Sequence, residues 1–129
     1  MNPIFVCTIP GKPGILKNSK RLIRVRGRML PISSKKYKAW SHMACAEILK
    51  SRRVFSTITR PVRLVGKFFL KNHQHESDLS NAIQGIEDLL EECKIIENDK
   101  LIHHLELSKS FGHEIERVEV ELFELKECA

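Results

Sequence analysis

The clearest pattern of apolar and polar positions lies directly after Asp78. Apolar residues recur there at intervals of three and four, which places them on one stripe of a helix. The members of this stripe are Leu79, Ala82, Ile83, Ile86, Leu89, Leu90 and Cys93. The spacing predicts a buried amphipathic helix, with Ser77 or Asp78 as its N-terminal cap.

A second helix is predicted over residues 33–50, because no Pro or Gly interrupts this stretch and Ser33 or Ser34 can cap it. Its apolar positions again follow helical spacing. They are Tyr37, Trp40, Met43, Ala44, Ile48 and Leu49. Trp40 has the chemistry to stack on a nucleic-acid base, but at this spacing we expect it in the core.

Strand patterns fill most of the remaining chain. Apolar runs at residues 4–9 and 62–70 predict two strands, and the second is expected to be central because few of its residues are polar. Weak alternation around Gly27 predicts a hairpin or a bent edge strand over residues 21–31. Two more strands are expected at residues 101–107 and 115–125. The last of them has a wet, acidic face made of Glu116, Glu119, Glu121 and Glu124.

The order of these elements defines the expected fold class. It reads β, β-hairpin, α, β, α, β, β, which is typical of an α+β protein. A chain of 129 residues is the size of one ordinary domain. We therefore predict a single domain over residues 1–129, with a mixed or mostly antiparallel sheet covered by two main helices.

Charge is distributed very unevenly along the chain. Residues 1–75 hold 17 Lys and Arg against one acid, a net charge of +16, whereas residues 76–129 have a net charge of −10. A basic half of this strength indicates a polyanionic partner such as nucleic acid. The alternative is an ordinary charged surface whose two halves neutralise each other in the fold.

The cysteines and the hydropathy profile predict a cytoplasmic protein. No stretch approaches the roughly 18 consecutive apolar residues of a membrane helix, and the N-terminus lacks a secretory pattern. The four cysteines are Cys7, Cys45, Cys93 and Cys128, and none of them forms a C-x-x-C pair. We expect reduced, mostly buried thiols in a soluble protein without a membrane partner.

Three acidic residues are candidates for a magnesium site, namely Glu76, Asp78 and Asp99. Magnesium-dependent nucleases need two or three converging carboxylates, because the hard cation takes oxygen ligands. A helix of about sixteen residues spans roughly 24 Å. Asp99 must therefore be carried back by the chain after Cys93, or it must reach Asp78 of the partner subunit, and both remain open. Taken alone, Asp78 is equally well explained as a helix cap and Asp99 as a turn residue.

Histidines do not suggest a transition-metal site. His73, His75, His103 and His104 match no spacing that is typical of metal ligands. We therefore expect no zinc or other transition-metal centre.

Three short segments resemble the signature region of the RusA family of Holliday-junction resolvases. They are Asp78-Leu79-Ser80-Asn81, then Asp88-Leu89-Leu90, then Ile96-Glu97-Asn98-Asp99. In the family these correspond to D-L-D-N, to D-x-L within a helix and to a D-D pair before a strand. A helix that opens with Ser-x-x-x-Tyr-x-x-Trp and a basic N-terminal loop are weaker similarities.

The resemblance implies a homodimer that binds four-way DNA junctions and makes paired nicks with Mg²⁺ or Mn²⁺, without a small-molecule cofactor. Asp78 and Asp99 match the family's catalytic and metal-binding aspartates, and Asp88 matches its mid-helix aspartate. Glu76 is a hypothetical third metal ligand, since residues i and i+2 point the same way in an extended segment. Cations of the basic half would contact phosphates. We expect these to be Lys12, Lys17, Lys20, Arg21, Arg24, Arg26, Arg28, Lys35 and Lys36.

Three departures from the family pattern bear on activity. Ser80 and Asn98 stand where the family has aspartates, and Gln84 stands where many members have a lysine. Loss of a carboxylate weakens metal binding, and loss of a lysine removes charge stabilisation at the phosphate. A DNA-binding protein of the same fold without catalysis is therefore an alternative. A second alternative is an interaction protein whose acidic half binds a basic partner.

Overall fold

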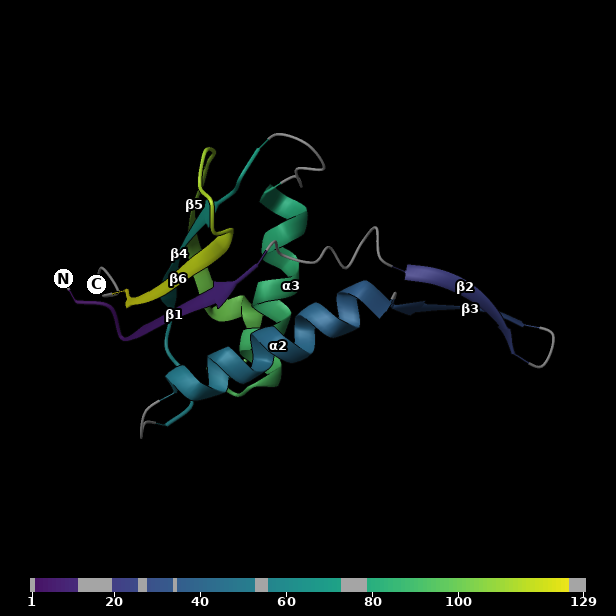
Figure 1. Cartoon of the computed structure of the whole chain (residues 1–129). Helices are drawn as coiled ribbons and strands as arrows, with labels where there is room; N and C mark the ends of the chain where they lie inside the picture. The colour runs from purple at the N-terminus through teal and green to yellow at the C-terminus, as the bar shows by residue number, and fades with distance from the viewer. Residues whose placement is uncertain are drawn as a thin grey trace.

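The computed structural model describes the backbone of residues 2–11, 20–25, 28–33, 35–52, 56–72 and 79–125, with side chains except at 20–25, 28–33, 35–37 and 81. Two helices, a 3-10 helix and six strands lie in these ranges (Figure 1). In chain order they are β1 (Phe5–Pro10), β2 (Lys20–Val25), β3 (Arg28–Ser33), α2 (Lys35–Ser51), β4 (Val62–Phe69), α3 (Leu79–Glu92), η1 (Asp99–Leu101), β5 (Ile102–Ser110) and β6 (Arg117–Glu124).

Four of the strands form one mixed sheet in the order β1-β6-β4-β5. β6 pairs antiparallel with β1 and with β4, whereas β4 and β5 are parallel. Parallel neighbours need a crossover connection, and α3 supplies it. The predicted α+β class with a mixed sheet is confirmed, and so is the central position of β4.

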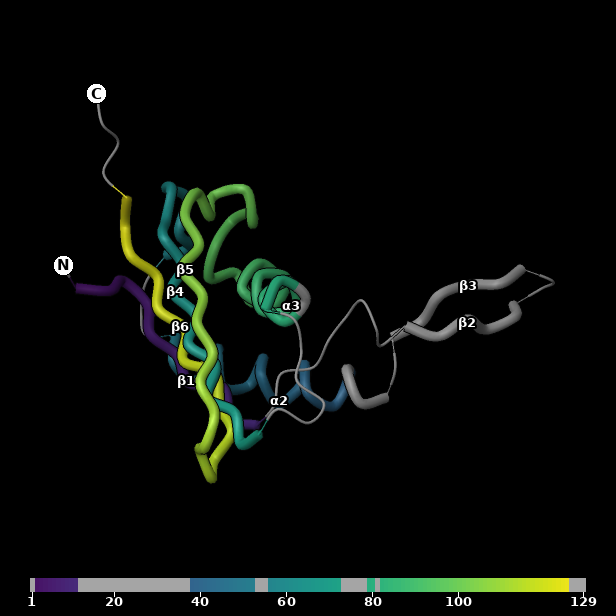
Figure 2. Tube along the Cα trace, turned by 90° about the horizontal axis from the view of Figure 1, so that it is seen from above, coloured from purple at the N-terminus to yellow at the C-terminus, as the bar shows by residue number. Residues whose placement is uncertain are grey.

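Both helices cover the same face of this sheet (Figure 2). Alternate residues of β1 and β6 point into the core, among them Cys7, Val120 and Leu122. The predicted stripe of α3 packs onto them, since its members from Ala82 to Cys93 are buried and Leu79 packs against the core at its edge. Trp40 is 7% exposed, so its expected place in the core is confirmed.

Close packing between α3 and the sheet occurs at Gly66 in β4. A Cβ atom at this position would lie 3.1 Å from Leu107 Cδ2 and 3.5 Å from Ile83 Cδ1. The absence of a side chain therefore lets α3 and β5 approach the central strand closely.

The opposite face of the sheet carries charged side chains among apolar ones such as Val6 and Val65. Glu121 of β6 lies 3.9 Å from Lys67, and Arg63 stacks on Phe123 at 4.5 Å from the ring centroid. The expected wet, acidic face of β6 is thus mixed in sign, because cations of β4 lie beside its glutamates. Glu124 does not belong to this face, since it pairs with Val62 and shares the alternation of Val118, Val120 and Leu122.

Several predicted boundaries were wrong by one to three residues. β6 begins at Arg117, so Ile115 lies before the strand and is 71% exposed. Leu101 belongs to η1, and β5 continues to Ser110. β5 is an edge strand, which explains why its Leu105 remains 46% exposed.

The predicted hairpin is confirmed as β2 and β3, which form a two-stranded antiparallel sheet of their own. Lys20 pairs with Ser33 at one end and Val25 with Arg28 at the other. The hairpin leads directly into α2. Neither α2 nor α3 has the length and apolar character of a transmembrane helix.

Candidate functional site

Asp99 is held at the C-terminal end of α3 by the way this helix stops. Lys94 adopts a left-handed backbone with φ 60°, and the N–H groups of Lys94 and Ile95 donate to the carbonyls of Glu91 and Leu90. This nested pair of bonds is a Schellman motif. The chain turns there and reaches Asp99, the first residue of η1, after only four more residues.

The segment between α3 and η1 is fixed from a second side. Ile58 and Ile96 form a parallel β-bridge, the N–H of Ile58 donates to Ile95 and the N–H of Glu97 donates to Ile58. Asn98 then caps η1, because its side-chain oxygen accepts a bond of 2.8 Å from the N–H of Lys100. The position of Asp99 is therefore determined by the backbone on both sides of it.

Glu91 and Glu87 of α3 lie near Asp99. Its backbone N–H donates to Glu91 Oε1 at 3.2 Å, while the Asp99 side chain itself is exposed. Burial raises the pKa of the half-buried Glu87, and the negative charges of Asp99 and Asp88 raise it further. This end of α3 is consequently a region of concentrated negative potential, which favours cations.

A polar stripe continues from these carboxylates along the solvent-facing side of α3. We define it as Ser80, Gln84, Glu87, Asp88 and Glu91. Their spacings of three, four and seven residues place them on one face of the helix. Gln84 and Ser80 are exposed, and the other three are half-buried. Ser80 and Gln84, which depart from the family pattern, therefore lie on the same face of α3 as the acids near Asp99.

Of the three predicted carboxylates, only Asp99 lies in the described part of the chain. Asp78, Glu76 and the proposed N-terminal cap of α3 lie outside the described residues. Leu79 and Glu91 are separated by about 18 Å at the usual helical rise. The chain after Cys93 does not carry Asp99 back along α3, so a carboxylate at the helix start would have to bridge this length within one subunit.

Metal-binding side chains do not gather into a complete site within the described residues. No group of three or more His, Cys, Asp or Glu residues there is arranged to hold an ion. His103 and His104 are exposed on β5, and His73 and His75 lie outside the described residues. The carboxylate of Asp99 is a hard oxygen donor of the type that Mg²⁺ prefers, but further ligands are needed.

Six of the predicted phosphate-binding cations lie on described elements, namely β2, β3 and α2. Lys20, Arg21 and Arg24 are in β2, and Arg28 is in β3. Lys35 and Lys36 open α2. Lys12, Lys17 and Arg26 lie outside the described residues. Six of the nine cations thus occupy a hairpin and the start of the helix that follows it.

Part of the charge asymmetry is neutralised across the sheet. Among the described residues, Arg60 contacts Glu124 at 2.6 Å, and Arg63 lies 3.7 Å from Glu106. Together with Lys67 and Glu121, each of these pairs joins a cation of the basic half to an acid of the acidic half. The alternative of mutual neutralisation therefore applies to β4 and the residues just before it.

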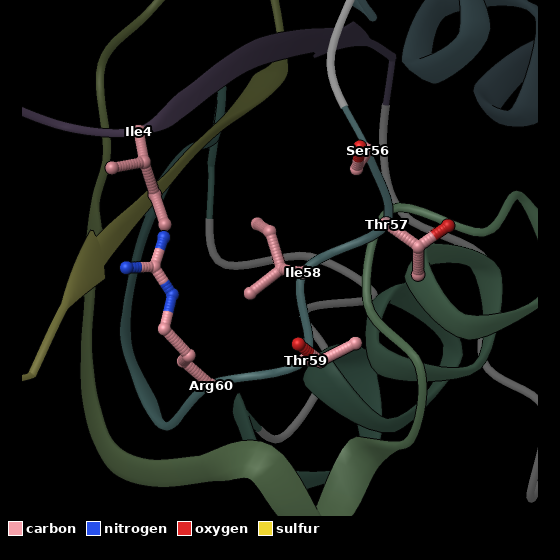
Figure 3. Close-up of a pocket in the computed structure, with 6 residues that line it drawn as sticks. All are labelled: Ile4, Ser56, Thr57, Ile58, Thr59 and Arg60. Atoms are coloured by element: carbon pink, nitrogen blue, oxygen red, sulfur yellow. The ribbon is translucent and has the colours of Figure 1, made fainter.

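A pocket of about 350 Å³ is drawn in Figure 3. It lies at the end of the sheet where β1, β4 and β5 begin, and Asp99 lies just before β5. It is lined by Ile4 and by residues 56–60. The Arg60 side chain extends along it toward Ile4 (Figure 3), and Glu124 already neutralises this cation. The lining contains no carboxylate, so the pocket is not the predicted acidic site.

Sequence reasoning missed Glu87 and Glu91 as neighbours of Asp99. Their spacing of four residues from each other, and of seven from Ser80 and Gln84, already placed them on the polar side of the predicted helix. Glu87 and Glu91 lie near Asp99 because the chain turns at Lys94. A non-glycine residue in the left-handed region gives no clear signal in a sequence.

Comparison with known proteins identifies the family. No curated protein sequence gave a significant match to the chain. The family model described as endodeoxyribonuclease RusA matches residues 10–123, which include β1's last residue and most of β6. Since this match covers most of the 129 residues, the chain belongs to the RusA endodeoxyribonuclease family.

Proposed function

We propose that this protein is a magnesium-dependent endodeoxyribonuclease, which resolves four-way DNA junctions by paired nicks. It acts as a homodimer of subunits that each form one domain over residues 1–129. The observation that carries the proposal is the family match over residues 10–123. The negative potential around Asp99 supports it, because a phosphodiester-cutting site needs carboxylates that attract a divalent cation.

The proposed catalytic site is shared between the two subunits. Asp99 lies at the C-terminal end of α3, whereas Asp78 precedes Leu79 at the helix start. A two-fold axis that sets the two α3 helices antiparallel would bring Asp99 of one subunit to the helix start of the other. In this arrangement the two aspartates of a site come from different subunits, so the length of α3 no longer separates them.

Magnesium in this site would be held by Asp99, by Asp78 of the partner subunit and by Glu76 as a third ligand. The ion would polarise the phosphodiester and make water more acidic. The protein's own part is to fix the carboxylates. The N–H of Asp99 is anchored on Glu91, and Asn98 uses its side chain to cap η1. Mn²⁺ has similar ligand preferences and would support the same role.

Binding of the junction arms is assigned to the basic hairpin and the start of α2. Phosphate contacts by Lys and Arg release counterions, so affinity is expected to fall steeply with salt. Alanine at Arg21, Arg24 and Arg28 should weaken junction binding and reduce its salt dependence. Alanine at Arg60, which already contacts Glu124, is the matched control and should change binding little.

Mixed dimers test the shared site directly. Asp78→Asn and Asp99→Asn homodimers are each expected to lose at least about 100-fold of junction cleavage. In a dimer of one variant with the other, one shared site keeps both aspartates and the other site has neither. Equal mixing with subunit exchange should therefore restore single nicks at about a quarter of the wild-type rate. Paired nicks should not return.

The reciprocal mixture is the matched control. A subunit that carries both Asp78→Asn and Asp99→Asn should inactivate a wild-type partner, because each shared site then contains one altered residue. Sites contained within one subunit would give the opposite pair of results, with no restoration in the first mixture and one active site in the second.

Loss of catalysis during evolution is the competing outcome. If the wild-type protein binds junctions but makes no nicks over a wide range of Mg²⁺ and enzyme concentrations, the nuclease proposal is wrong and a DNA-binding role remains. The role of Glu76 is tested separately with Glu76→Gln at limiting Mg²⁺, where cleavage should fall and then recover as the ion is raised.

A further inference from the structure

Two cysteines that are far apart in the sequence meet between the helices. Cys45 lies in α2 and Cys93 directly follows α3, and their Sγ atoms are 2.9 Å apart. The described thiols Cys7, Cys45 and Cys93 are all free. A disulfide has an S–S length of about 2.05 Å, so the two sulfurs need to move less than about 1 Å to bond.

The backbone around this pair is already held in place. Arg52, just after α2, donates from Nη1 to the carbonyl of Cys93 at 3.1 Å. The Schellman motif fixes the chain immediately after Cys93. The backbone therefore holds the two cysteines close to each other, which favours formation of a disulfide.

The two sulfurs differ in their access to solvent. Cys45 is half-buried and lines a pocket of about 490 Å³, together with His42, Leu49 and Glu92. Cys93 is 5% exposed and is not among the residues that line this pocket. A small reagent can reach Cys45 first, while Cys93 is placed to attack only what has bound at Cys45.

We propose that Cys45 and Cys93 form an oxidisable dithiol, which a small-molecule disulfide converts into an intramolecular bond joining α2 to α3. This inference is independent of the proposed nuclease function. It concerns the described thiols only, and Cys128 lies outside the described residues.

The reaction is an exchange of two thiols for one disulfide. The Cys45 thiolate attacks one sulfur of the small disulfide, which releases one small thiolate and leaves a mixed disulfide. The Cys93 thiolate then attacks Cys45 Sγ, and the mixed disulfide breaks to release the second small thiolate. Two protons from the protein thiols end on the two released thiolates, and two electrons reduce the small disulfide.

The reduced form should persist at neutral pH. Burial raises the pKa of the Cys93 thiol to about 12, and the hydrogen bond with Cys45 acts in the same direction. The negative charge of Glu92 on α3 also disfavours the Cys93 thiolate, as would ionisation of Cys45 on α2 or of Cys7 on β1. Since the thiolate is the attacking species, closure should accelerate as the pH rises from 7 to 9.

Oxidised glutathione is the probe for the test, applied to the full chain at pH 9 under native conditions and in urea, because the Cys93 thiol reacts slowly at neutral pH. Native oxidation should reduce the four alkylatable thiols to two and lower the intact mass by about 2 Da, reversibly with a reductant. Tryptic digestion should then give residues 39–50 linked to residues 72–94, which contain Cys45 and Cys93. Cys45→Ser and Cys45→Ala should each abolish this link.

Cys7→Ser is the matched control, because Cys7 is also buried near this pair, and it should leave the link intact. A glutathione adduct that stays on Cys45 would overturn the proposal, since Cys93 would then fail to displace it. A link to Cys7 or Cys128 in its place, or a Cys45–Cys93 link that forms only in urea, would overturn it as well.

Discussion

The buried face and the polar stripe of α3 differ in how much the sequence reveals about their surroundings. The buried face is a repeated pattern, in which each apolar residue is three or four positions from the next and every member meets the same core. The polar stripe has the same helical spacing, but this spacing does not show what lies beside it. At its C-terminal end Glu87 and Glu91 lie near Asp99 of η1. A pattern can therefore specify where a helix packs, but the chemistry of its open face depends on what the chain places beside it.

The largest expected effect concerns the buried face. Ile86 is fully buried, so Ile86→Ala should lower the free energy of unfolding by about 3 kcal/mol through lost burial and a cavity. Gln84→Ala, two residues away on the exposed side, should change it by less than about 0.5 kcal/mol. Urea denaturation measures both. Similar losses for the two variants would show that α3 is not divided into two faces in this way.

A smaller effect is expected when the polar stripe is returned to the family pattern. Ser80→Asp combined with Gln84→Lys should raise junction cleavage about tenfold at limiting Mg²⁺, because a carboxylate and a cation are added beside the proposed site. Stability should remain nearly unchanged, since both positions are exposed. Ser80→Asn with Gln84→Met is the uncharged control. Equal gains in both double variants would argue against an electrostatic role.

The smallest effect is expected within the group of acids near Asp99. Burial and the charges of Asp99 and Asp88 raise the pKa of Glu87, so its charged form costs the fold some stability above the pH at which it ionises. Glu87→Gln should therefore raise the free energy of unfolding by about 0.3 kcal/mol at pH 7. Chemical denaturation against Glu92→Gln, an exposed glutamate of the same helix, provides the measurement. A loss of stability would mean that Glu87 makes a favourable contact instead.

The fold was predictable where local patterns are repeated. Spacing alone located the buried stripe of α3, and the nearly continuous apolar run of β4 indicated its central position. The parallel pairing of β4 with β5 could not be deduced, because hydrogen bonds between distant strands leave no local signal. Ile115 was misplaced for the opposite reason, since its apolar side chain fits the alternation but the strand begins two residues later.

The candidate site was predictable only in part. Asp99 was identified as a residue, but its position at one end of α3 depends on the backbone of Lys94 and on the bridge between Ile58 and Ile96. Neither feature has a sequence pattern. The approach of Cys45 to Cys93 is a similar case, because 47 residues separate Cys45 from Cys93 along the chain and only helix packing brings them together.

The connection between α3 and η1 behaves as a spacer of set length. Lys94 ends α3 with its left-handed backbone, Ile96 forms the β-bridge with Ile58, and Asn98 caps η1. Substitution of the exposed Glu97 leaves these bonds in place, because Glu97 takes part only through its backbone N–H, but a segment one residue longer or shorter cannot form all of them. In this stretch the number of residues is therefore a stricter requirement than their identity, and a protein that kept every side chain could still lose the position of Asp99.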